Sequence, residues 1–182
     1  MKKIAVLFSG TGTNFAYIVE HLHQKALEVC VALTNNSQAK GIEVAKAANI
    51  PLEIVDSKAF ESREAFDAEV VRRLKHYNPD LTVLAGFMRI LTPVFTEQIE
   101  AINLHPSLLP RHKGLHAIER SFEDEHSQGG VSVHWVTSEL DGGEVIVQKS
   151  IEKEGLDFEA YDQQIRTIEK EALAEAIHKV LA

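Results

Sequence analysis

Hydrophobic residues in the first half of the chain fall into short apolar runs that alternate with amphipathic stretches. Residues 3–8 (KIAVLF) are a continuous apolar run, which is typical of a strand covered on both faces. Residues 62–77 instead repeat their apolar side chains at helical spacing, in a stripe of Phe66, Val70, Val71 and Leu74. By the same reasoning we expect strands at 27–33, 52–56, 80–87 and 101–105, and helices at 14–23, 38–49 and 92–99. Strands and helices that alternate in this way predict a parallel, doubly wound sheet.

The second half of the chain has a different pattern. Residues 130–137 and 144–152 have the pattern of strands, and the linker between them (138–143) is too short for a crossover helix, so the two should be antiparallel. Helices are expected at 114–126 and 158–181, the latter with a stripe of Tyr161, Ile165, Ile168, Ala172 and Ile177. We therefore predict an α/β fold in a single domain over 1–182. It should contain a doubly wound, Rossmann-like, mostly parallel sheet, an antiparallel C-terminal strand pair and a long C-terminal helix.

The acidic balance of the chain narrows the classes of partner. Its 19 basic and 27 acidic residues give a net charge of −8, which disfavours binding to nucleic acid or to an anionic membrane surface. No apolar run approaches the roughly 20 residues of a membrane-spanning helix, and no export signal is recognised. The single cysteine, Cys30, lies in an apolar run and is expected to be a buried hydrophobe. These features predict a cytoplasmic protein.

A glycine-rich turn follows the first predicted strand. The segment FSGTGTNF (8–15) leads into a helix, and such a turn presents backbone N–H groups to an anion. It differs from a dinucleotide fingerprint, because Phe15 occupies the third small position and the second strand ends in LTNN (33–36) without an acidic residue. It also lacks the Gly-Lys-Ser/Thr of a P-loop. The remaining interpretations are a site for one phosphate or a plain tight turn with Thr/Asn capping, and the phosphate would bind to Gly12, Thr13 and Asn14.

An amide and an imidazole lie two residues apart at the end of a predicted strand. Asn103 and His105 should project to the same side, and ligands of a doubly wound sheet bind beyond the carboxyl ends of its strands. Asp141 lies in the LDGG turn between the two later strands. These groups can perform acyl chemistry: Asn103 stabilises an oxyanion, His105 does so if protonated, and Asp141 holds the imidazolium or relays a proton. The sequence has no Gly-x-Ser-x-Gly, which favours direct transfer over a covalent intermediate.

Each of these residues also has a purely structural interpretation. Asparagine at a strand end is often a turn residue, histidine before proline often bonds a carbonyl, and Asp-Gly-Gly is a hairpin turn signal. A zinc site is disfavoured, because Gly114 interrupts the helix that would align His112 with His116 and no His-Glu-x-x-His occurs.

Several segments together resemble a known enzyme family. They are SGTGTN (9–14), SREAFD (62–67), LAGFMRIL (84–91), NLHPSLLP (103–110), GLHA (114–117), VSVHWV (131–136) and ELDGG (139–143). In this order they resemble the phosphoribosylglycinamide formyltransferases, the folate-dependent formyltransferases of purine synthesis. The resemblance implies transfer of a formyl group from 10-formyltetrahydrofolate to the amino group of glycinamide ribonucleotide. Both are small-molecule substrates, and no metal is implied.

The resemblance also implies roles for individual residues. Asn103, His105 and Asp141 would be catalytic, and Gly12, Thr13 and Asn14 would hold the substrate phosphate. Arg166 would reach that phosphate and Glu169 would hold the ribose. The folate would contact Arg63, the pterin-pocket wall of Met88, Arg89, Ile90 and Leu91, Asn103, and the closing loop of Thr137, Ser138, Glu139, Leu140 and Asp141.

Some positions depart from the family pattern or stay open. Thr13 replaces the usual serine but keeps the hydroxyl, and Glu169-Lys170 replaces a Glu-His pair, so the register of the last helix is open by one residue. Arg166 and Glu169 could instead form a surface pair. His116 and His134 could be structural or part of the site. The family pattern also implies a cis peptide between Leu109 and Pro110.

Two other functions remain open on the sequence. The first is another folate-formyl enzyme, either a hydrolase or a transferase to an amino sugar. The second is a nucleotide-binding regulatory module on a Rossmann-like scaffold. The oligomeric state is not predicted.

Overall fold

A computed structural model describes all of residues 1–182. The chain forms two compact units, one of Met1–Ile102 with Leu181 and one of Asn103–Val180 with Ala182. The single-domain assignment over 1–182 therefore stays a prediction.

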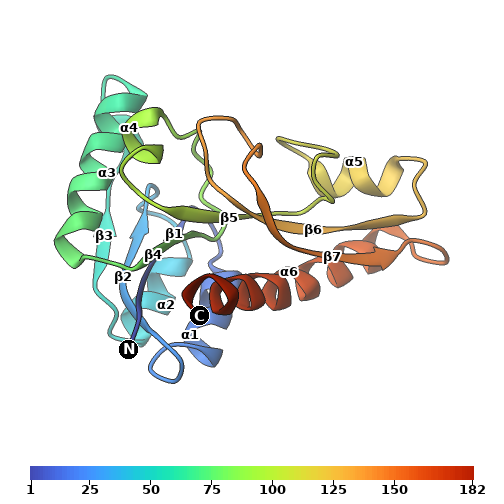
Figure 1. Ribbon diagram of the computed structural model, residues 1–182, viewed down its shortest axis with the longest axis horizontal. Helices are drawn as coiled ribbons and strands as arrows, with labels where there is room; N and C mark the ends of the chain where they lie inside the picture. Colours follow the sequence, from blue (N-terminus) through green and yellow to red (C-terminus); the bar gives the residue numbers. More distant parts are fainter. The chain divides into compact units, whose positions relative to one another are not determined.

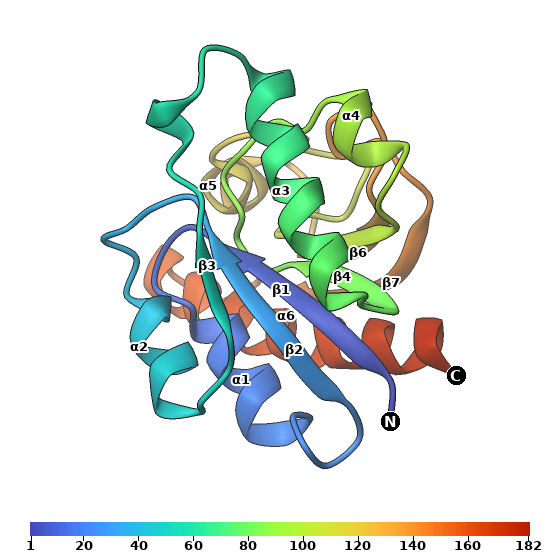
Figure 2. The same ribbon diagram turned by 90° about the vertical axis from the view of Figure 1, so that its left-hand side faces the viewer.

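The first unit contains parallel strands and helices in alternation. Its strands are neighbours in the order β3-β2-β1-β4 and all are parallel, with Val6 of β1 between Ala32 of β2 and Val83 of β4. The strands are β1 (Lys3–Phe8), β2 (Glu28–Thr34), β3 (Leu52–Ile54) and β4 (Leu81–Leu84), and the α-helices are α1 (Thr13–His21), α2 (Gly41–Ala47), α3 (Arg63–Tyr77) and α4 (Pro93–Thr96). A short 3-10 helix, η1, covers Ser57–Ala59. Figures 1 and 2 show α3 on one side of the strands β1–β3 and α1 with α2 on the other.

The sequence explains these elements locally. Every residue of β1 after Lys3 is buried, because helices cover both faces of the strand. Helix α3 begins where the Ser62 hydroxyl accepts the N–H of Ala65 at 3.0 Å, and it ends at Asn78 in the left-handed region (φ 51°). The predicted α3 stripe of Phe66, Val70, Val71 and Leu74 is buried.

The second unit contains an antiparallel strand pair and a long helix. Strand β5 (Ala101–His105) leads into α5 (Ala117–Glu123), β6 (Gln128–Trp135), β7 (Val145–Glu152) and α6 (Phe158–Leu181). Strands β6 and β7 pair antiparallel, with Ser132 opposite Gln148. Helix α6 contacts β7 through Lys149 and Glu175, whose charged groups are 2.9 Å apart. The predicted α/β fold with an antiparallel strand pair and a long C-terminal helix is confirmed.

Several predicted elements are longer than the observed ones. The strand expected at 80–87 ends at Leu84, and the chain then turns through Gly86 at φ 83°. The helix expected at 114–126 covers only Ala117–Glu123, because His116 has a left-handed backbone (φ 58°) and Asp124 is extended. The helices expected at 38–49 and 92–99 are likewise shortened, to α2 and α4.

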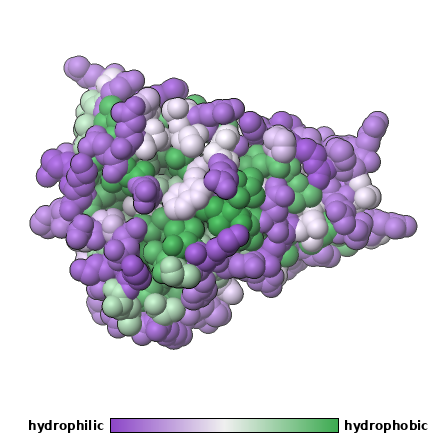
Figure 3. Space-filling view, viewed as in Figure 1, coloured by the Kyte–Doolittle hydropathy of each residue, from purple (hydrophilic) through white to green (hydrophobic).

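The burial pattern follows the predicted division of polar and apolar residues. Cys30 is buried, as expected, and on α6 the stripe residues are buried except Ile168, next to which Glu169 is buried instead. Hydrophilic side chains cover most of the right-hand end of the molecule in Figure 3, the region of α5, β6 and β7 in Figure 1. The protein has no helix with the length and hydropathy needed to cross a membrane. The peptide bond between Leu109 and Pro110 is cis, as the family pattern implied.

Candidate active site

Four polar side chains of the second unit form a compact cluster. Asn103 and His105 end β5, His134 lies near the end of β6, and Asp141 occupies the turn between β6 and β7. His105 is 7 % exposed and Asp141 is 8 % exposed, whereas Asn103 is half-buried. Asp141 adopts a left-handed backbone (φ 52°), a conformation that aspartate tolerates better than most residues. We refer to Asn103, His105, His134 and Asp141 as the His105 cluster.

The distances within the His105 cluster link all of its members. His105 Nδ1 lies 3.5 Å from Asp141 Oδ2, and His134 Nε2 lies 3.6 Å from Asp141 Oδ1. The amide Nδ2 of Asn103 lies 3.1 Å from His134 Nε2. The structure thus brings together the three residues that the sequence nominated as catalytic, although 36 residues (141 − 105) separate Asp141 from His105.

Backbone carbonyls define which ring nitrogens carry hydrogen. A carbonyl oxygen only accepts, so His105 Nε2 donates to the carbonyl of His112 at 2.8 Å, and His134 Nδ1 donates to that of Trp135 at 2.9 Å. The other nitrogen of each neutral ring is then an acceptor. Nε2 of His134 accepts one N–H of the Asn103 amide, and Nδ1 of His105 faces Asp141.

Burial and neighbouring charges set the ionisation of the central pair. Burial lowers the pKa of His105 and outweighs the opposing effects of the His112 carbonyl and the Asp141 charge. Burial also opposes ionisation of Asp141, but its polar neighbours, among them the Gly114 N–H that donates to Oδ2 at 2.9 Å, outweigh burial, so the pKa of Asp141 is lowered. The pair therefore combines a neutral imidazole with a carboxylate. The sequence argument had assigned His105 to the oxyanion only on the condition that the ring is protonated, and burial opposes that condition.

The structure also places the histidines that the sequence left open. His134 belongs to the His105 cluster, and the signal in the sequence was its place in the alternating segment VSVHWV. In the structure it lies two residues after the buried Ser132 on β6. His116 is exposed and precedes α5, while His112 lies in the preceding loop and pairs with Asp124. No group of three or more His, Cys, Asp or Glu side chains has the geometry to hold a metal ion.

The glycine-rich turn of the first unit leads directly into α1. Gly12 has a left-handed backbone (φ 71°) and packs so closely on Gly41 that a Cβ atom would lie 2.6 Å from its Cα. No side chain caps the start of α1 at Gly12. Thr13 is exposed and Asn14 is half-buried. A turn capped by Thr or Asn would use the N–H groups at this helix start. No capping side chain uses them here, so they stay available to a ligand.

The residues expected at a folate lie partly in each unit. In the first unit, Arg63 is exposed at the start of α3, Met88 and Ile90 are 66 % and 49 % exposed, and Leu91 is buried. The guanidinium of Arg89 lies 4.7 Å from the centre of the Phe66 ring. In the second unit, the loop residues Thr137, Ser138, Glu139 and Leu140 are exposed and lead into the buried Asp141.

Helix α6 carries one buried acidic side chain. Glu169 is only 9 % exposed, and burial raises its pKa to about 7 against the attraction of Arg166 and Lys170. Arg166 does not form the surface pair that the sequence left open, because its Nε lies 3.1 Å from Asp162 Oδ2.

The buried carboxyl group of Glu169 should make stability depend on pH. The pKa of Glu169 in the folded protein (about 7) exceeds the ordinary 4.5. Its contribution to the free energy of unfolding is therefore complete below about pH 4.5 and is lost as the pH rises through 7. Glu169→Gln removes this loss. We expect the free energy of unfolding of the variant, relative to the unaltered protein, to rise by about 2 to 3 kcal/mol between pH 5 and pH 8.

Urea unfolding at the two pH values measures this effect. Glu171→Gln is the matched control, because Glu171 is an exposed glutamate on the same helix. A Glu169→Gln difference that is constant between the two pH values would show that Glu169 does not titrate in this range.

Comparison with known proteins identifies relatives across almost the whole chain. A family model described as formyl transferase matches residues 2–177. The phosphoribosylglycinamide formyltransferase of Escherichia coli (strain K12) is 41 % identical over 152 residues, which cover 81 % of this chain and 72 % of that protein. That of Bacillus subtilis (strain 168) is 34 % identical and covers 100 % of this chain and 95 % of that protein. The crystal structure of phosphoribosylglycinamide formyltransferase from Campylobacter jejuni matches with a TM-score of 0.97 and 48 % identity, over 100 % of this chain and 98 % of that one.

Proposed function

The chain belongs to the formyl transferase family, and from this premise we propose that it transfers the formyl group of 10-formyltetrahydrofolate to the amino group of glycinamide ribonucleotide. The observation that carries the proposal is the His105 cluster, in which an amide donor lies beside a neutral imidazole and a carboxylate. These groups match the needs of a carbonyl that becomes tetrahedral while its attacking amine loses a proton. The relatives are phosphoribosylglycinamide formyltransferases, and this supports glycinamide ribonucleotide as the acceptor.

In this proposal Asn103 stabilises the charge on the formyl oxygen. The substrate amine attacks the formyl carbon, and negative charge develops on the oxygen as the carbon becomes tetrahedral. One N–H of the Asn103 amide is held by His134, and the other is available to the oxyanion. His134 thereby orients the amide, and no covalent enzyme intermediate is required.

The His105–Asp141 pair receives the amine proton. Nδ1 of His105 is the unprotonated nitrogen, and a proton placed there is stabilised by the Asp141 carboxylate 3.5 Å away. As the carbon–nitrogen bond to N10 of the folate breaks, this proton passes to N10. One formyl group moves to the acceptor and one proton moves to the donor, so the reaction balances without an external acid or base.

We further propose the binding roles that the family pattern implies. The turn of Gly12, Thr13 and Asn14 would hold the substrate phosphate with N–H groups that no side chain caps. Arg166 would approach the phosphate, and Glu169 would hold the ribose. The folate would contact Arg63, Met88, Arg89, Ile90, Leu91, Asn103, Thr137, Ser138, Glu139, Leu140 and Asp141.

A turnover assay with and without the acceptor tests the proposed function. Purified protein is incubated with 10-formyltetrahydrofolate, and loss of donor and formylation of glycinamide ribonucleotide are both followed. We expect loss of 10-formyltetrahydrofolate only when the acceptor is present. The amount of formylated product should equal the amount of donor lost. Donor loss without acceptor would indicate a hydrolase, transfer only to an amino sugar would indicate that acceptor class, and ligand binding without turnover would indicate a regulatory module.

Removal of the phosphate from the acceptor should weaken its binding. A charge-assisted hydrogen bond contributes roughly 1.5–3 kcal/mol, so loss of even one should raise KM about 10- to 100-fold while kcat changes little. Steady-state kinetics with the two acceptors measure the ratio of KM values. Thr13→Val should raise KM for the phosphorylated acceptor alone, because it removes one hydroxyl and keeps the shape of the side chain. Equal KM values for the two acceptors would contradict a phosphate site.

A further inference from the structure

One loop of the second unit contacts both members of the His105–Asp141 pair. This loop, residues 111–116, is the last part of the connection between β5, which ends at His105, and α5, which begins at Ala117. Its His112 carbonyl accepts the Nε2–H of His105 at 2.8 Å, and its Gly114 N–H donates to Asp141 Oδ2 at 2.9 Å. The position of the loop therefore sets both the tautomer of His105 and one hydrogen bond of Asp141.

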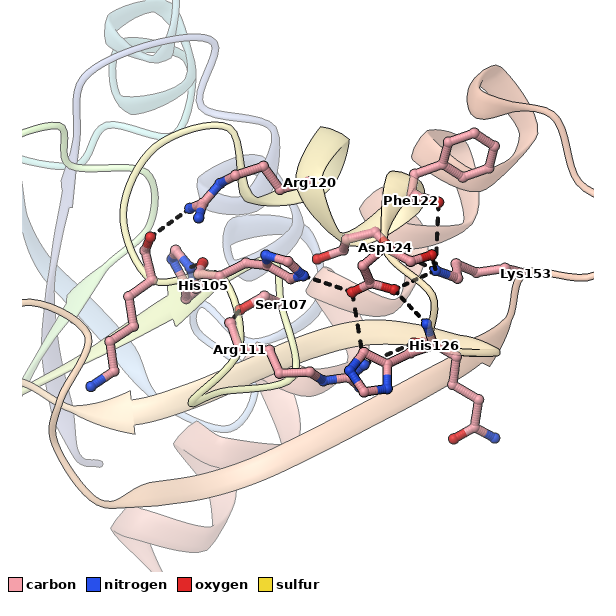
Figure 4. Close-up of polar contacts among 12 residues, drawn as sticks. His105, Ser107, Arg111, Arg120, Phe122, Asp124, His126 and Lys153 are labelled. Carbon is pink, nitrogen blue, oxygen red and sulfur yellow. Dashed lines mark hydrogen bonds and ion pairs between the residues drawn. The ribbon is translucent and has the colours of Figure 1, made fainter.

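The same loop is held on its other side by Asp124. His112 Nε2 donates to Asp124 Oδ2 at 2.6 Å, and Lys153 Nζ donates to Asp124 Oδ1 at 2.7 Å. The N–H of His126 also donates to Oδ1 at 2.9 Å. Figure 4 shows Asp124 at the centre of these contacts, with Lys153 on one side of it. We refer to Asp124, His112 and Lys153 as the Asp124 anchor.

The Asp124 anchor is a fixed, charged point rather than a loose surface pair. The Lys153 side chain is 10 % exposed and the Asp124 side chain is 15 % exposed. Lys153 Nζ also donates to the carbonyl of Ser121 at 2.8 Å, at the C-terminal end of α5 where a cation is favoured. Burial opposes the charge on Asp124, but the hydrogen bonds from Lys153 and His112 outweigh it and lower the pKa of the carboxyl group.

His112 transmits this constraint through its own backbone. Its φ of 54° lies in the left-handed region, which costs roughly 1–2 kcal/mol in an L-residue and persists only when surrounding contacts impose it. The imidazole bonds Asp124 while the carbonyl of the same residue bonds His105. Arg120 adds support by donating to the carbonyl of Leu115 at 2.8 Å and to that of Lys113.

We propose that Asp124, fixed by Lys153, is a positioning residue for the reaction. By holding the His112 imidazole, Asp124 keeps the His112 carbonyl in place to accept the Nε2–H of His105. Nδ1 of His105 then stays unprotonated and can accept the proton beside Asp141. Asp124 itself does not contact His105 or Asp141. Its kinetic consequence rests on the proposed function, but its effect on the His105 tautomer does not.

Four variants of the full chain test this role. His112→Leu removes the hydrogen bond between His112 and Asp124, and Asp124→Asn removes the negative charge that holds both His112 and Lys153. His112→Gln keeps an N–H donor near the position of Nε2. Glu175→Gln is the control, because it breaks an ion pair of the same unit at a side chain that is 56 % exposed. Each variant is examined by steady-state kinetics, by thermal unfolding and by nitrogen NMR of the His105 ring, which distinguishes the two neutral tautomers.

We expect the two anchor-breaking variants to lower kcat roughly 10- to 100-fold with little change in either KM, as small misplacements of catalytic groups do. Their His105 ring should show a mixture of tautomers. His112→Gln and Glu175→Gln should keep kcat and the single Nε2–H tautomer. If Asp124→Asn fails to fold, His112→Leu, which leaves the Asp124–Lys153 pair intact, supplies the same test.

Anchor-breaking variants that lose only thermal stability, with kcat and the His105 tautomer unchanged, would overturn the proposal and leave Asp124 a structural residue. Failure of the proposed function has a different signature. In that case the unaltered protein transfers no formyl group, yet the His105 spectra of the variants still decide whether the anchor sets the tautomer.

Discussion

Asp141→Asn should lower kcat by about two to four orders of magnitude, the usual cost of losing a positioned acid–base group. The amide has nearly the shape of the carboxyl group, and its oxygen can still accept the N–H of Gly114, which now lies 2.9 Å from Asp141 Oδ2. What the variant loses is the negative charge 3.5 Å from His105 Nδ1. Without that charge, a proton on Nδ1 of the buried imidazole has no compensating partner, and the amine proton has no acceptor pair.

Single-turnover kinetics at saturating substrates measure this effect on the chemical step. Glu144→Gln is the matched control, since Glu144 is an exposed acid three residues along the same turn. Binding of the folate should change much less than kcat, because the shape of the residue is kept. A single-turnover rate constant equal to that of the unaltered protein would show that the proton leaves the amine by another route.

Asn103→Ala should lower kcat by about two to three orders of magnitude, as loss of one oxyanion donor does. The half-buried amide is held by His134 at 3.1 Å, so its free N–H is fixed before the substrate binds. The alanine variant lacks that donor. A water molecule cannot replace the donor equally well, because it would have to reorient as charge develops on the formyl oxygen.

Steady-state kinetics and folate binding together separate this role from a structural one. The expected result is a fall in kcat with little change in folate affinity. Gln128→Ala is the control, because it removes an exposed amide of the same unit whose Nε2 bonds only Glu152 among the protein side chains. A loss confined to KM would show that Asn103 binds substrate without stabilising the transition state.

The sequence predicted the elements whose burial produces a regular apolar pattern along the chain. Strand 3–8 was found because both faces of β1 are covered, which leaves a continuous apolar run, and helix 158–181 was found because its stripe persists over the whole of α6. The helix at 114–126 was overextended because its ends depend on the left-handed backbone of His116 and the extended backbone of Asp124. Neither residue type signals such a conformation by itself.

Three members of the His105 cluster, Asn103, His105 and Asp141, were named from the sequence, whereas His134 was left open and the ionisation of the cluster could not be predicted. Alternation along β5 placed Asn103 and His105 on one side, and the turn signal placed Asp141 at the end of a hairpin. The neutral state of His105 depends on its burial and its tautomer depends on the carbonyl of His112, and neither tertiary burial nor a backbone acceptor can be read from residue identity. The same holds for Glu169, whose raised pKa arises from tertiary burial.

The central claim is that His105 enters the reaction as a neutral ring with hydrogen on Nε2 and an open Nδ1 facing Asp141. Nitrogen NMR of the His105 ring in the unaltered protein near neutral pH tests it most directly. The account predicts a protonated Nε2 and an unprotonated Nδ1. A ring with both nitrogens protonated, or with hydrogen on Nδ1 alone, would contradict it.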